Sequence, residues 1–389
     1  MSIFEKSFNE ISSQDILAFL RLRHAEGKKV DYKAALKLRT DGQRKEFLAD
    51  VASFANCDGG ILLLGVDEAN GIPRDKLPGI PCDDPDETKG RIENIILSGI
   101  EPSIRGHDIG FFEVEGKTIL LLRVPRSWAR PHMVVFQRTN KFYSRNSHGK
   151  YLLDVTELRE AFLLQDTIER TISDFRTQRI SEIANGDLPF QLAGGGKLIV
   201  HLFPIPGIAE VGEVDLHRSE QCRVPRLGTS RPAEQRYNFE GLLASVFSDD
   251  GQVLCYTQIY RKGTVEAVNA VMLREKVIRS AALEKSLVRF LFECVRHYGA
   301  LGVNPPLIVT GAMTGVKGMK MGVRGSVPPG YARMAIDKDI LVLPKARIDS
   351  FDDLGTAAVL KPLIDSVWNA CGWPCSENFD VAGIWQLSL

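Results

Sequence analysis

Apolar residues in the first part of the chain follow two different periods. In Gln43–Cys57 they recur at helical spacing, and the Asp-Gly-Gly that follows ends the predicted helix. Gly60–Val66 is apolar on both faces, which predicts a strand buried between two layers. Similar patterns predict helices at 11–22 (capped by Ser12 or Ser13), 88–98 and 154–184, strands at 28–36, 131–136 and 141–147, and a hairpin over 111–127 turning near Glu115–Gly116. This alternation is typical of a compact α+β domain.

A segment that contains several glycines and a proline follows Ala184 and separates this region from a second one. Beyond it, apolar runs predict strands at 197–205, 253–268 and 306–313, and helices at 276–298 and 360–370. We therefore expect an N-terminal domain with its leading helix at 1–165, a helical linker at 166–189 and a second α+β domain, of unknown role, at 190–389.

Two glycine-rich stretches resemble phosphate-binding loops. Gly194–Leu198 (GGGKL) has no Ser or Thr after the lysine and leads into a strand, so we predict a turn. Gly315–Gly325 carries Lys317, Lys320 and Arg324 among glycines. This second stretch is either a flexible surface loop or a loop that contacts phosphate.

Composition and charge limit the class of protein. The formal net charge is +0, and the hydrophobic and charged contents of 44% and 25% are those of a globular chain. No apolar run approaches the roughly 20 residues that span a bilayer, and the N-terminus lacks the pattern of a secretory signal. The 7 scattered cysteines fit reduced thiols better than a disulfide framework. We expect a cytoplasmic protein with no membrane partner.

Three acids of the first domain stand where a site could form. Glu26 lies in the turn before the first strand, Asp31 within that strand, and Asp67 at the end of the buried strand. Carboxylates that converge on Mg²⁺ or Mn²⁺ let a nuclease activate water and neutralise a phosphate. An odd spacing places Glu26 and Asp31 on opposite faces of a regular strand, so they converge only if Glu26 lies on the turn, which Gly27 allows. The alternative is that all three are solvated turn acids.

A local excess of positive charge follows the predicted hairpin. Residues 117–152 contain no Asp or Glu, and aromatic residues (Trp128, Phe136, Phe142 and Tyr143) are interleaved with the cations Lys117, Arg123, Arg126, Arg130, Arg138, Lys141, Arg145 and Lys150. Cations can follow a phosphate backbone, and aromatic rings can stack on unpaired bases. In the alternative interpretation, the cations pair with acids elsewhere in the fold and the aromatic rings belong to the core.

Five blocks in order carry a family resemblance: EGKKVDYK, FLADVASFANCDGGILLLGVDEANG, IENIILSGIEPSI, LLRVPRSWARPHMV and FYSRNSHGKYLLDVTELREAFL. Together they resemble the Schlafen AlbA-type domain, also called the divergent AAA or putative ATP-binding family, over about 26–164. The resemblance implies an Alba-like mixed α/β fold for the first domain. The second domain resembles no family that we can name.

In its Schlafen branch, the resemblance implies a metal-dependent endoribonuclease that acts on structured RNA such as tRNA. The family's catalytic and metal-binding acids correspond to Glu26, Asp31 and Asp67, with Mg²⁺ or Mn²⁺ as the cofactor. Asp31-Tyr32-Lys33 replaces the family's Glu-Phe-Lys, which shortens one ligand by a methylene. Lys33 and the cations at 123, 126, 130, 138, 141, 145 and 150 would position phosphates. The alternatives are a non-catalytic DNA- or RNA-binding regulator and, less favoured, a nucleotide-binding (ATP-binding) protein.

The resemblance also bears on assembly. Animal Schlafen proteins resemble two such domains in tandem around RNA, whereas this chain has one. We therefore expect a homodimer that binds RNA, rather than DNA, in a shared groove. The apolar segment Ala281–Tyr298 is the candidate interface, and the alternative is that it forms a core helix.

Overall fold

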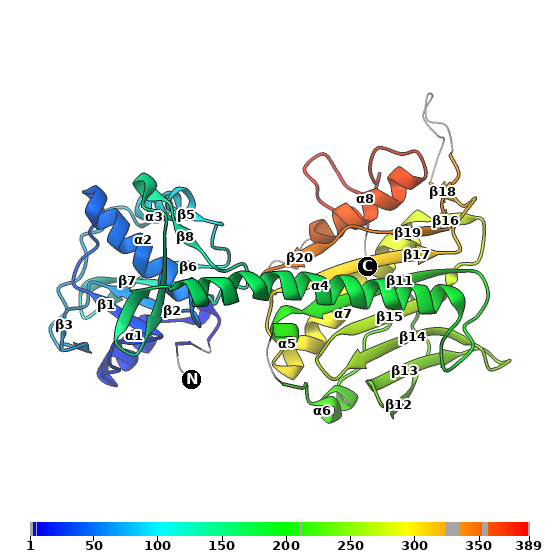
Figure 1. Cartoon of the computed structure of the whole chain (residues 1–389), viewed down its shortest axis with the longest axis horizontal. Coiled ribbons are helices and arrows are strands. Elements are labelled where there is room, and N and C mark those ends of the chain that lie inside the picture. Colours follow the sequence, from blue (N-terminus) through cyan, green and yellow to red (C-terminus); the bar gives the residue numbers. More distant parts are fainter. Residues whose placement is uncertain (1–2, 5, 210–211, 324–333, 352–356, 388–389) are drawn as a thin grey trace. The chain divides into compact units, whose positions relative to one another are not determined.

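The structure is a computed structural model that describes residues 3–4, 6–209, 212–323, 334–351 and 357–387. The chain forms two compact units, Met1–Asp166 and Thr167–Leu389. Both combine helices with mostly antiparallel sheets, so the predicted α+β class is confirmed (Figure 1). Among the described residues, none of the helices is both long and apolar enough to cross a membrane.

The first unit is built on a four-stranded sheet. Its order is β1 (Val30–Lys33), β2 (Gly60–Leu64), β7 (Lys117–Val124) and β6 (Asp108–Val114), with β1 parallel to β2 and the other pairs antiparallel. Every residue of β2 is buried, as its apolar sequence predicted. Ile61 and Leu63 face one layer, while Leu62 and Leu64 face the other.

Helices cover both faces of this sheet. On one face lies α1 (Ser13–Arg21), whose N-cap is Ser12, one of the two predicted caps, in a capping box with Asp15. On the other face lie α2 (Asp41–Asn56) and α3 (Pro85–Gly99). The hairpin between β6 and β7 turns at Glu115 and Gly116, which have φ values of 52° and 72°. This turn confirms the predicted hairpin.

A second sheet packs on the far side of α2. Its order is β10 (Gly149–Leu152), β9 (Lys141–Asn146), β8 (Met133–Val134) and β5 (Ile100–Glu101). Because α2 has a sheet on either side, its residues from Phe47 to Asn56 are all buried. Asn56 joins the layers: its amide group donates to the carbonyls of His132 and Tyr143 and accepts from the His132 N–H.

Short elements complete the first unit. They include the strand pair β3 (Glu68–Ala69) and β4 (Ile72–Pro73), which the apolar pattern did not predict, and a 3-10 turn at Phe8–Glu10. The strand predicted at 131–136 is shorter, because a 3-10 turn begins at Phe136 (Phe136–Arg138). The last helix, α4 (Val155–Asn185), begins in the first unit and ends in the second.

The second unit is organised around one large antiparallel sheet. Its order is β12-β13-β14-β15-β11-β17-β19, and β20 also pairs with β17. The strands are β11 (Gly196–Pro204), β12 (Glu234–Asn238), β13 (Gly241–Phe247), β14 (Val253–Tyr260), β15 (Val265–Leu273), β17 (Leu307–Thr314), β19 (Ile340–Val342) and β20 (Ala346–Ile348). Of the predicted turn at Gly194–Leu198, Gly194 and Gly195 precede β11, whereas the strand itself begins at Gly196.

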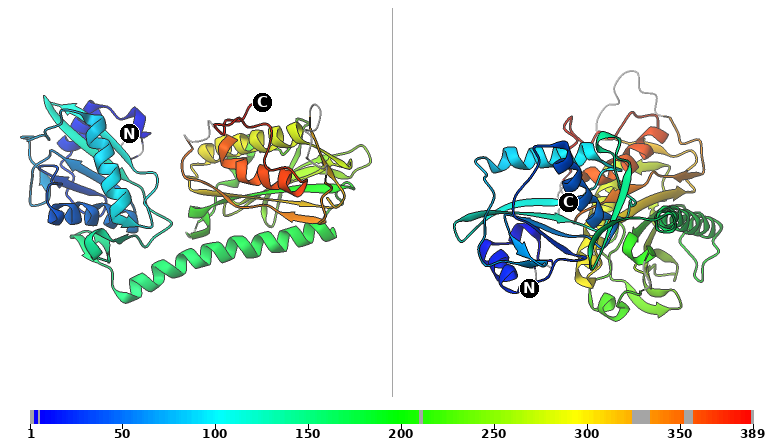
Figure 2. Two further views of the ribbon diagram at one scale, coloured as in Figure 1. Left: turned by 90° about the horizontal axis from the view of Figure 1, so that it is seen from above. Right: turned by 60° about the vertical axis from the view of Figure 1, so that its left-hand side comes forward.

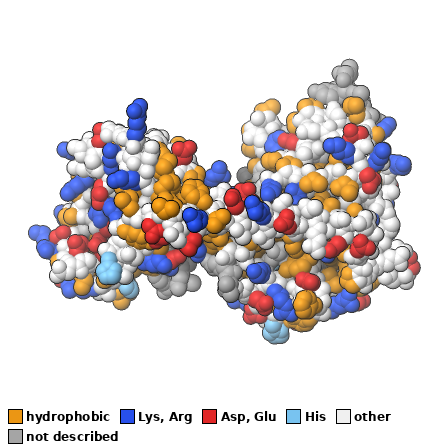
Figure 3. All heavy atoms as spheres, in the orientation of Figure 1, with side chains coloured by type: hydrophobic (Ala, Val, Ile, Leu, Met, Phe, Trp, Pro, Cys, Tyr) orange, Lys and Arg blue, Asp and Glu red, His pale blue; other side chains and the backbone are white. Residues whose placement is uncertain are grey.

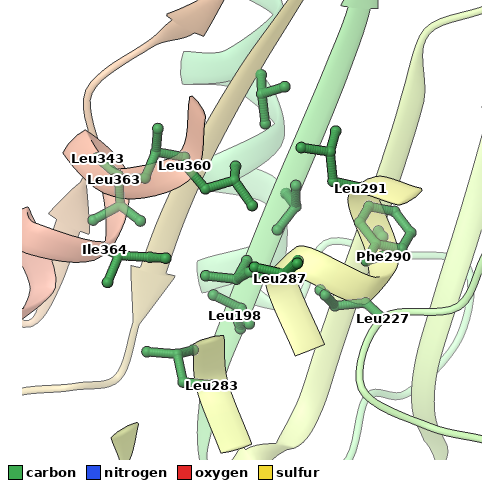
Figure 4. Packing of buried hydrophobic residues seen from close by; sticks show 14 of the residues in the cluster. Leu198, Leu227, Leu283, Leu287, Phe290, Leu291, Leu343, Leu360, Leu363 and Ile364 are labelled. Carbon is green, nitrogen blue, oxygen red and sulfur yellow. The ribbon is translucent and has the colours of Figure 1, made fainter. Parts of the chain in front are cut away.

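The helix α7 (Ser280–Leu301) lies with α8 (Lys361–Ala370) on one face of this sheet (Figure 2, left). Leu283, Leu287 and Phe290 of α7 pack there with residues of β11 and α8 (Figure 4). The apolar stripe of α7 is therefore used in its own core. This is the core-helix alternative, and it removes the reason for treating 281–298 as a dimer interface.

The opposite face of the sheet is covered by the second half of α4, a region that we predicted to be a linker. Ile180 and Ile183 pack against β11, β13, β14 and β15. A polar contact is buried in the same layer. Arg179 donates two hydrogen bonds, of 2.8 and 2.9 Å, to the carboxylate of Glu266, which has no exposed surface. His201 and Tyr256 also contact that carboxylate.

The remaining elements connect these layers. They are α5 (Ile205–Ala209), α6 (Leu216–Gln221), a 3-10 turn at Ala357–Leu360, and the parallel pair β16 (Val277–Arg279) and β18 (Lys320–Gly322). The glycine-rich stretch 315–325 is thus partly a strand, and Met319 and Met321 are buried in the core. Lys317 precedes β18, whereas Arg324 lies outside the described residues.

The buried Arg179–Glu266 pair makes a prediction about stability. Burial alone would raise the pKa of Glu266, but hydrogen bonds from Arg179 and His201 lower it to about 2, so the group is a carboxylate at neutral pH. Arg179→Met leaves that charge without its cation. We expect the second unit to lose about 3–5 kcal/mol of unfolding free energy in urea. Arg170→Met, on the exposed side of the same helix, should cost less than about 0.5 kcal/mol. Equal losses in the two variants would contradict this account.

Candidate functional site

Two of the three predicted acids, Glu26 and Asp31, are brought together. The Gly27 N–H donates to the Val30 carbonyl, which turns the chain just before β1. The Glu26 carboxylate then accepts a 2.7 Å hydrogen bond from the Tyr32 N–H and shares a hydrogen bond with the carboxyl group of Asp31. The turn at Gly27 therefore overcomes the unfavourable spacing, as the sequence suggested.

Asp31 is held by two cations. One of its oxygens lies 2.9 Å from Nη1 of Arg145 on β9, and the other accepts from the Lys33 ammonium. Asp31 and Arg145 are only 3% and 4% exposed. Although burial opposes it, the charges of Arg145 and Lys33 lower the pKa of Asp31. The Arg145 guanidinium also lies over the Phe54 ring, 4.2 Å from its centre.

A third buried acid, Asp50 on α2, belongs to the same network and was missed from the sequence. Its carboxylate lies 2.8 Å from Nζ of Lys150 and 3.8 Å from Nη1 of Arg145. Burial and the Asp31 charge raise the pKa of Asp50, which opposes the effect of Lys150. One signal was available: Asp50 is the single charged residue in the otherwise uncharged run 47–57.

Asp67 is placed differently. Its side chain is 43% exposed and lies 3.4 Å from Nη1 of Arg74. Within the described part of the chain, no group of three or more His, Cys, Asp or Glu is arranged to hold a metal ion. Both oxygens of Asp31 already face cations, so the predicted metal-binding set of Glu26, Asp31 and Asp67 does not fit a Mg²⁺ or Mn²⁺ ion in this arrangement.

A pocket of about 860 Å³ lies elsewhere in the first unit. It is enclosed by the end of α2, the loop after β7, the end of β9 and the first turns of α4. Its cations are Lys28, Arg126, Arg130 and Arg145, and its acids are Asp58, Glu157 and Glu160. The other lining residues are Asn56, Cys57, Pro131, Ser144, Asn146, Ser147, Tyr151, Leu153, Ala161 and Leu164.

Local contacts fix the charged groups of this pocket. Lys28 forms an ion pair with Asp58, and Nη1 of Arg126 lies 4.0 Å from the same carboxylate. The Arg126 guanidinium lies over the Trp128 ring, 4.2 Å from its centre. Arg130 donates to the carbonyl of Asn56. Two cations thus face the carboxylate of Asp58, and Glu157 and Glu160 line the same pocket.

The eight cations predicted to contact nucleic acid fall into three groups. Four form ion pairs within the fold, as the alternative interpretation proposed: Lys33 and Arg145 with Asp31, Arg123 with Asp108, and Lys150 with Glu46 and Asp50. Arg126 and Arg130 line the pocket, as Arg145 does. Arg138 and Lys141 are exposed, and no ion pair joins them to a described residue. Lys28 was not among the predicted residues.

Glu26 provides a test that depends on pH. Burial and the neighbouring Asp31 carboxyl raise the pKa of Glu26 from 4.5 to about 7. Between these two pH values the folded chain keeps a proton that the unfolded chain has lost, so stability falls as the pH rises. Glu26→Gln keeps the acceptor for the Tyr32 N–H but cannot ionise. We expect it to match the wild type at pH 4 and to be more stable at pH 8, by about 1 kcal/mol, because solvent screens a half-buried group.

The measurement is urea unfolding at both pH values. Glu93→Gln, the same change on the exposed side of α3, is the control and should follow the wild type throughout. A Glu26→Gln protein whose stability changes with pH as steeply as that of the wild type between pH 4 and 8 would show that Glu26 does not titrate in this range.

Comparisons with known proteins give related solved structures and one family match. No curated protein matches the chain. The DIP2311 protein from Corynebacterium diphtheriae aligns over 40% of this chain and 29% of its own length, with 18% identity and a TM-score of 0.29. The N-terminal domain of a protein related to the ATP-dependent DNA helicase RecG, from Nitrosomonas europaea, aligns over 35% of this chain and 88% of its own, with 26% identity and a TM-score of 0.28.

The chain therefore spans less than a third of the DIP2311 protein. The family comparison is more specific. Residues 26–154 match the Schlafen, AlbA_2 family, and this range contains the Glu26–Asp31 pair and most of the pocket. The match relates the domain to nucleic-acid function and agrees with the resemblance carried by the five sequence blocks. The domain at 26–154 of this chain belongs to the Schlafen AlbA_2 family.

Proposed function

We propose that the first unit binds nucleic acid and contacts its phosphates at the pocket bordered by Lys28, Arg126 and Arg130. The observation that supports this proposal most strongly is that Lys28, Arg126 and Arg130 all line one pocket of a Schlafen AlbA_2 domain. The family supports nucleic acid as the ligand, and the placement of three cations at one pocket supports the phosphate backbone as the part that is contacted.

The proposed interface uses fewer cations than the basic segment 117–152 contains. Arg123, Arg145 and Lys150 are already neutralised by buried or neighbouring carboxylates, so they have little charge to offer a phosphate. Lys141 is exposed at the start of β9, while Arg145 at the other end reaches the pocket. At the ordinary rise of a strand these ends are about 14 Å apart, enough for contacts to more than one phosphate.

RNA is the favoured ligand in this proposal, and that preference rests on the family resemblance. Phosphate contacts position a nucleic acid but do not distinguish its bases or sugars. A groove shared by two copies is not part of the proposal, because α7, the interface expected from the sequence, packs in its own core.

Catalysis is the second candidate. The hydrogen-bonded Glu26–Asp31 pair, with the pKa of Glu26 near 7, favours an acid–base role of the kind that Schlafen nucleases suggest. The ion pairs of Asp31 favour the non-catalytic role, since they occupy the oxygens that a metal would need. Of the two, we propose binding without cleavage.

Charge removal at the pocket tests binding. The double variant Arg126→Gln/Arg130→Gln should bind a structured RNA roughly tenfold more weakly at physiological salt. The slope of log K against log salt should fall by about one to two, because two phosphate contacts are lost. Arg123→Gln is the control, since Arg123 lies in the same basic segment but is paired with Asp108. Fluorescence anisotropy across a salt series measures both values.

Thermal melting would first establish that the variants are folded. If the double variant and Arg123→Gln bind RNA with the same affinity and the same salt dependence as the wild type, the pocket cations are structural and this interface is wrong.

Incubation with tRNA tests cleavage. We expect the full chain to leave tRNA intact with Mg²⁺ or Mn²⁺ while it binds that RNA. Cleavage that needs Mn²⁺, stops with chelator and disappears in Asp67→Ala would contradict the non-catalytic role. In that case Asp67, although apart from Glu26 and Asp31 here, would take part in a metal site formed with substrate.

A further inference from the structure

A second basic and aromatic surface lies on the second unit, around α6 and the edge strand β12. Residues 216–239 contain five arginines and two glutamates, and this segment is flanked by Asp215 and Glu240. In Figure 3, Lys or Arg, His, hydrophobic and acidic side chains lie close together at the lower edge of this unit. The Tyr237 hydroxyl donates a 2.7 Å hydrogen bond to Glu220, which joins β12 to α6 and engages one of the two acids.

The strand β12 is the outer strand of its sheet. It pairs with β13 alone, and all of its residues except Asn238 are exposed. Tyr237 is 50% exposed, and Phe239, which follows the strand, is 90% exposed. A charged edge strand guards against pairing with other strands, and Arg236 alone could serve that purpose. That protection does not account for a phenyl ring held almost entirely in water.

The arginines of this surface are available for a ligand. Arg218, Arg223, Arg231 and Arg236 are all exposed, and within the described residues no ion pair joins their side chains to a carboxylate. Other exposed arginines of the same unit do have such partners, for example Arg261 with Glu213 and Arg279 with Glu275. Within the described residues these four arginines are therefore not held in ion pairs.

We propose that this surface binds single-stranded nucleic acid, with the arginines on the phosphates and the rings of Tyr237 and Phe239 stacked on bases. Exposed aromatic rings flanked by cations are how sequence-tolerant single-strand binders work, because every base offers a face for stacking. A duplex keeps its bases stacked inside and offers no such face to Phe239. This goes beyond the function proposed above, since it assigns a contact to a unit outside the family match.

Anisotropy with the full chain and two labelled probes tests the proposal. One probe is an oligouridine of about twelve nucleotides, and the other is an abasic oligomer of the same length. Phe239→Ala should weaken oligouridine binding about five- to a hundredfold and leave abasic binding unchanged, because only bases can stack. Arg231→Ala/Arg236→Ala should weaken binding of both probes. Because these side chains are exposed, the fold should tolerate the changes.

Two control variants match these changes. Phe247→Ala alters a ring that is 39% exposed at the end of β13, and Arg279→Ala removes an arginine that is paired with Glu275. Neither should alter oligouridine binding. Equal affinities for the wild type, Phe239→Ala and Arg231→Ala/Arg236→Ala would overturn the proposal, whatever the pocket variants of the first unit do.

The other possible occupant of an edge strand is a second strand, from another copy of this chain or from another protein. In that case Phe239→Ala would leave oligouridine binding unchanged but would reduce the mass of the assembly in light scattering. That outcome would also overturn the proposal. Weaker oligouridine binding by Phe239→Ala, with normal binding of structured RNA by Arg126→Gln/Arg130→Gln, would support the second surface and contradict the first.

Discussion

The first unit depends on one buried guanidinium. Arg145 on β9 lies between Asp31 on β1 and Asp50 on α2, and thus joins both sheets and the helix packed between them. Burying these charges is unfavourable for each one alone and is tolerated only because they compensate one another. Lys33 and Lys150 complete the network at its exposed side. The network holds β9, and with it one wall of the pocket, against the central sheet.

This network also limits what the protein can do. Arg145 and Lys150 serve the fold, so much of the positive charge of residues 117–152 is not available to a nucleic acid. The same ion pairs occupy the oxygens of Asp31, one of the three acids expected to hold a metal ion. Within the described part of that segment, Arg138 and Lys141 are exposed and form no ion pair, while Lys28, Arg126 and Arg130 line the pocket. Further exposed arginines lie around β12 in the second unit. The proposed contacts are therefore few.

Much of the fold could be predicted from local pattern. The apolar runs of α2 and β2 identify buried elements, because an element covered on both sides needs apolar residues all round. The long second half of α4 could not be identified as a core element, because half-buried Arg179 is paired with Glu266, a buried residue far away in sequence. Likewise, β12 could not be predicted, because its exposed edge has a polar sequence without the alternation of apolar and polar residues that indicates a strand.

The site was predictable only in part, for the same reason. The approach of Glu26 to Asp31 follows from a local turn at Gly27, so the sequence could suggest it. Which cation neutralises which acid depends on contacts between distant segments, such as Arg145 with Asp31.

The most direct test of the whole account is photocrosslinking of the full chain to 4-thiouridine RNA, with the crosslinked peptides identified by mass spectrometry. We expect crosslinks within 126–131 and 231–239 and none at Arg123 or Lys150; crosslinks confined to the ion-paired residues of 117–124 and 145–150 would contradict it.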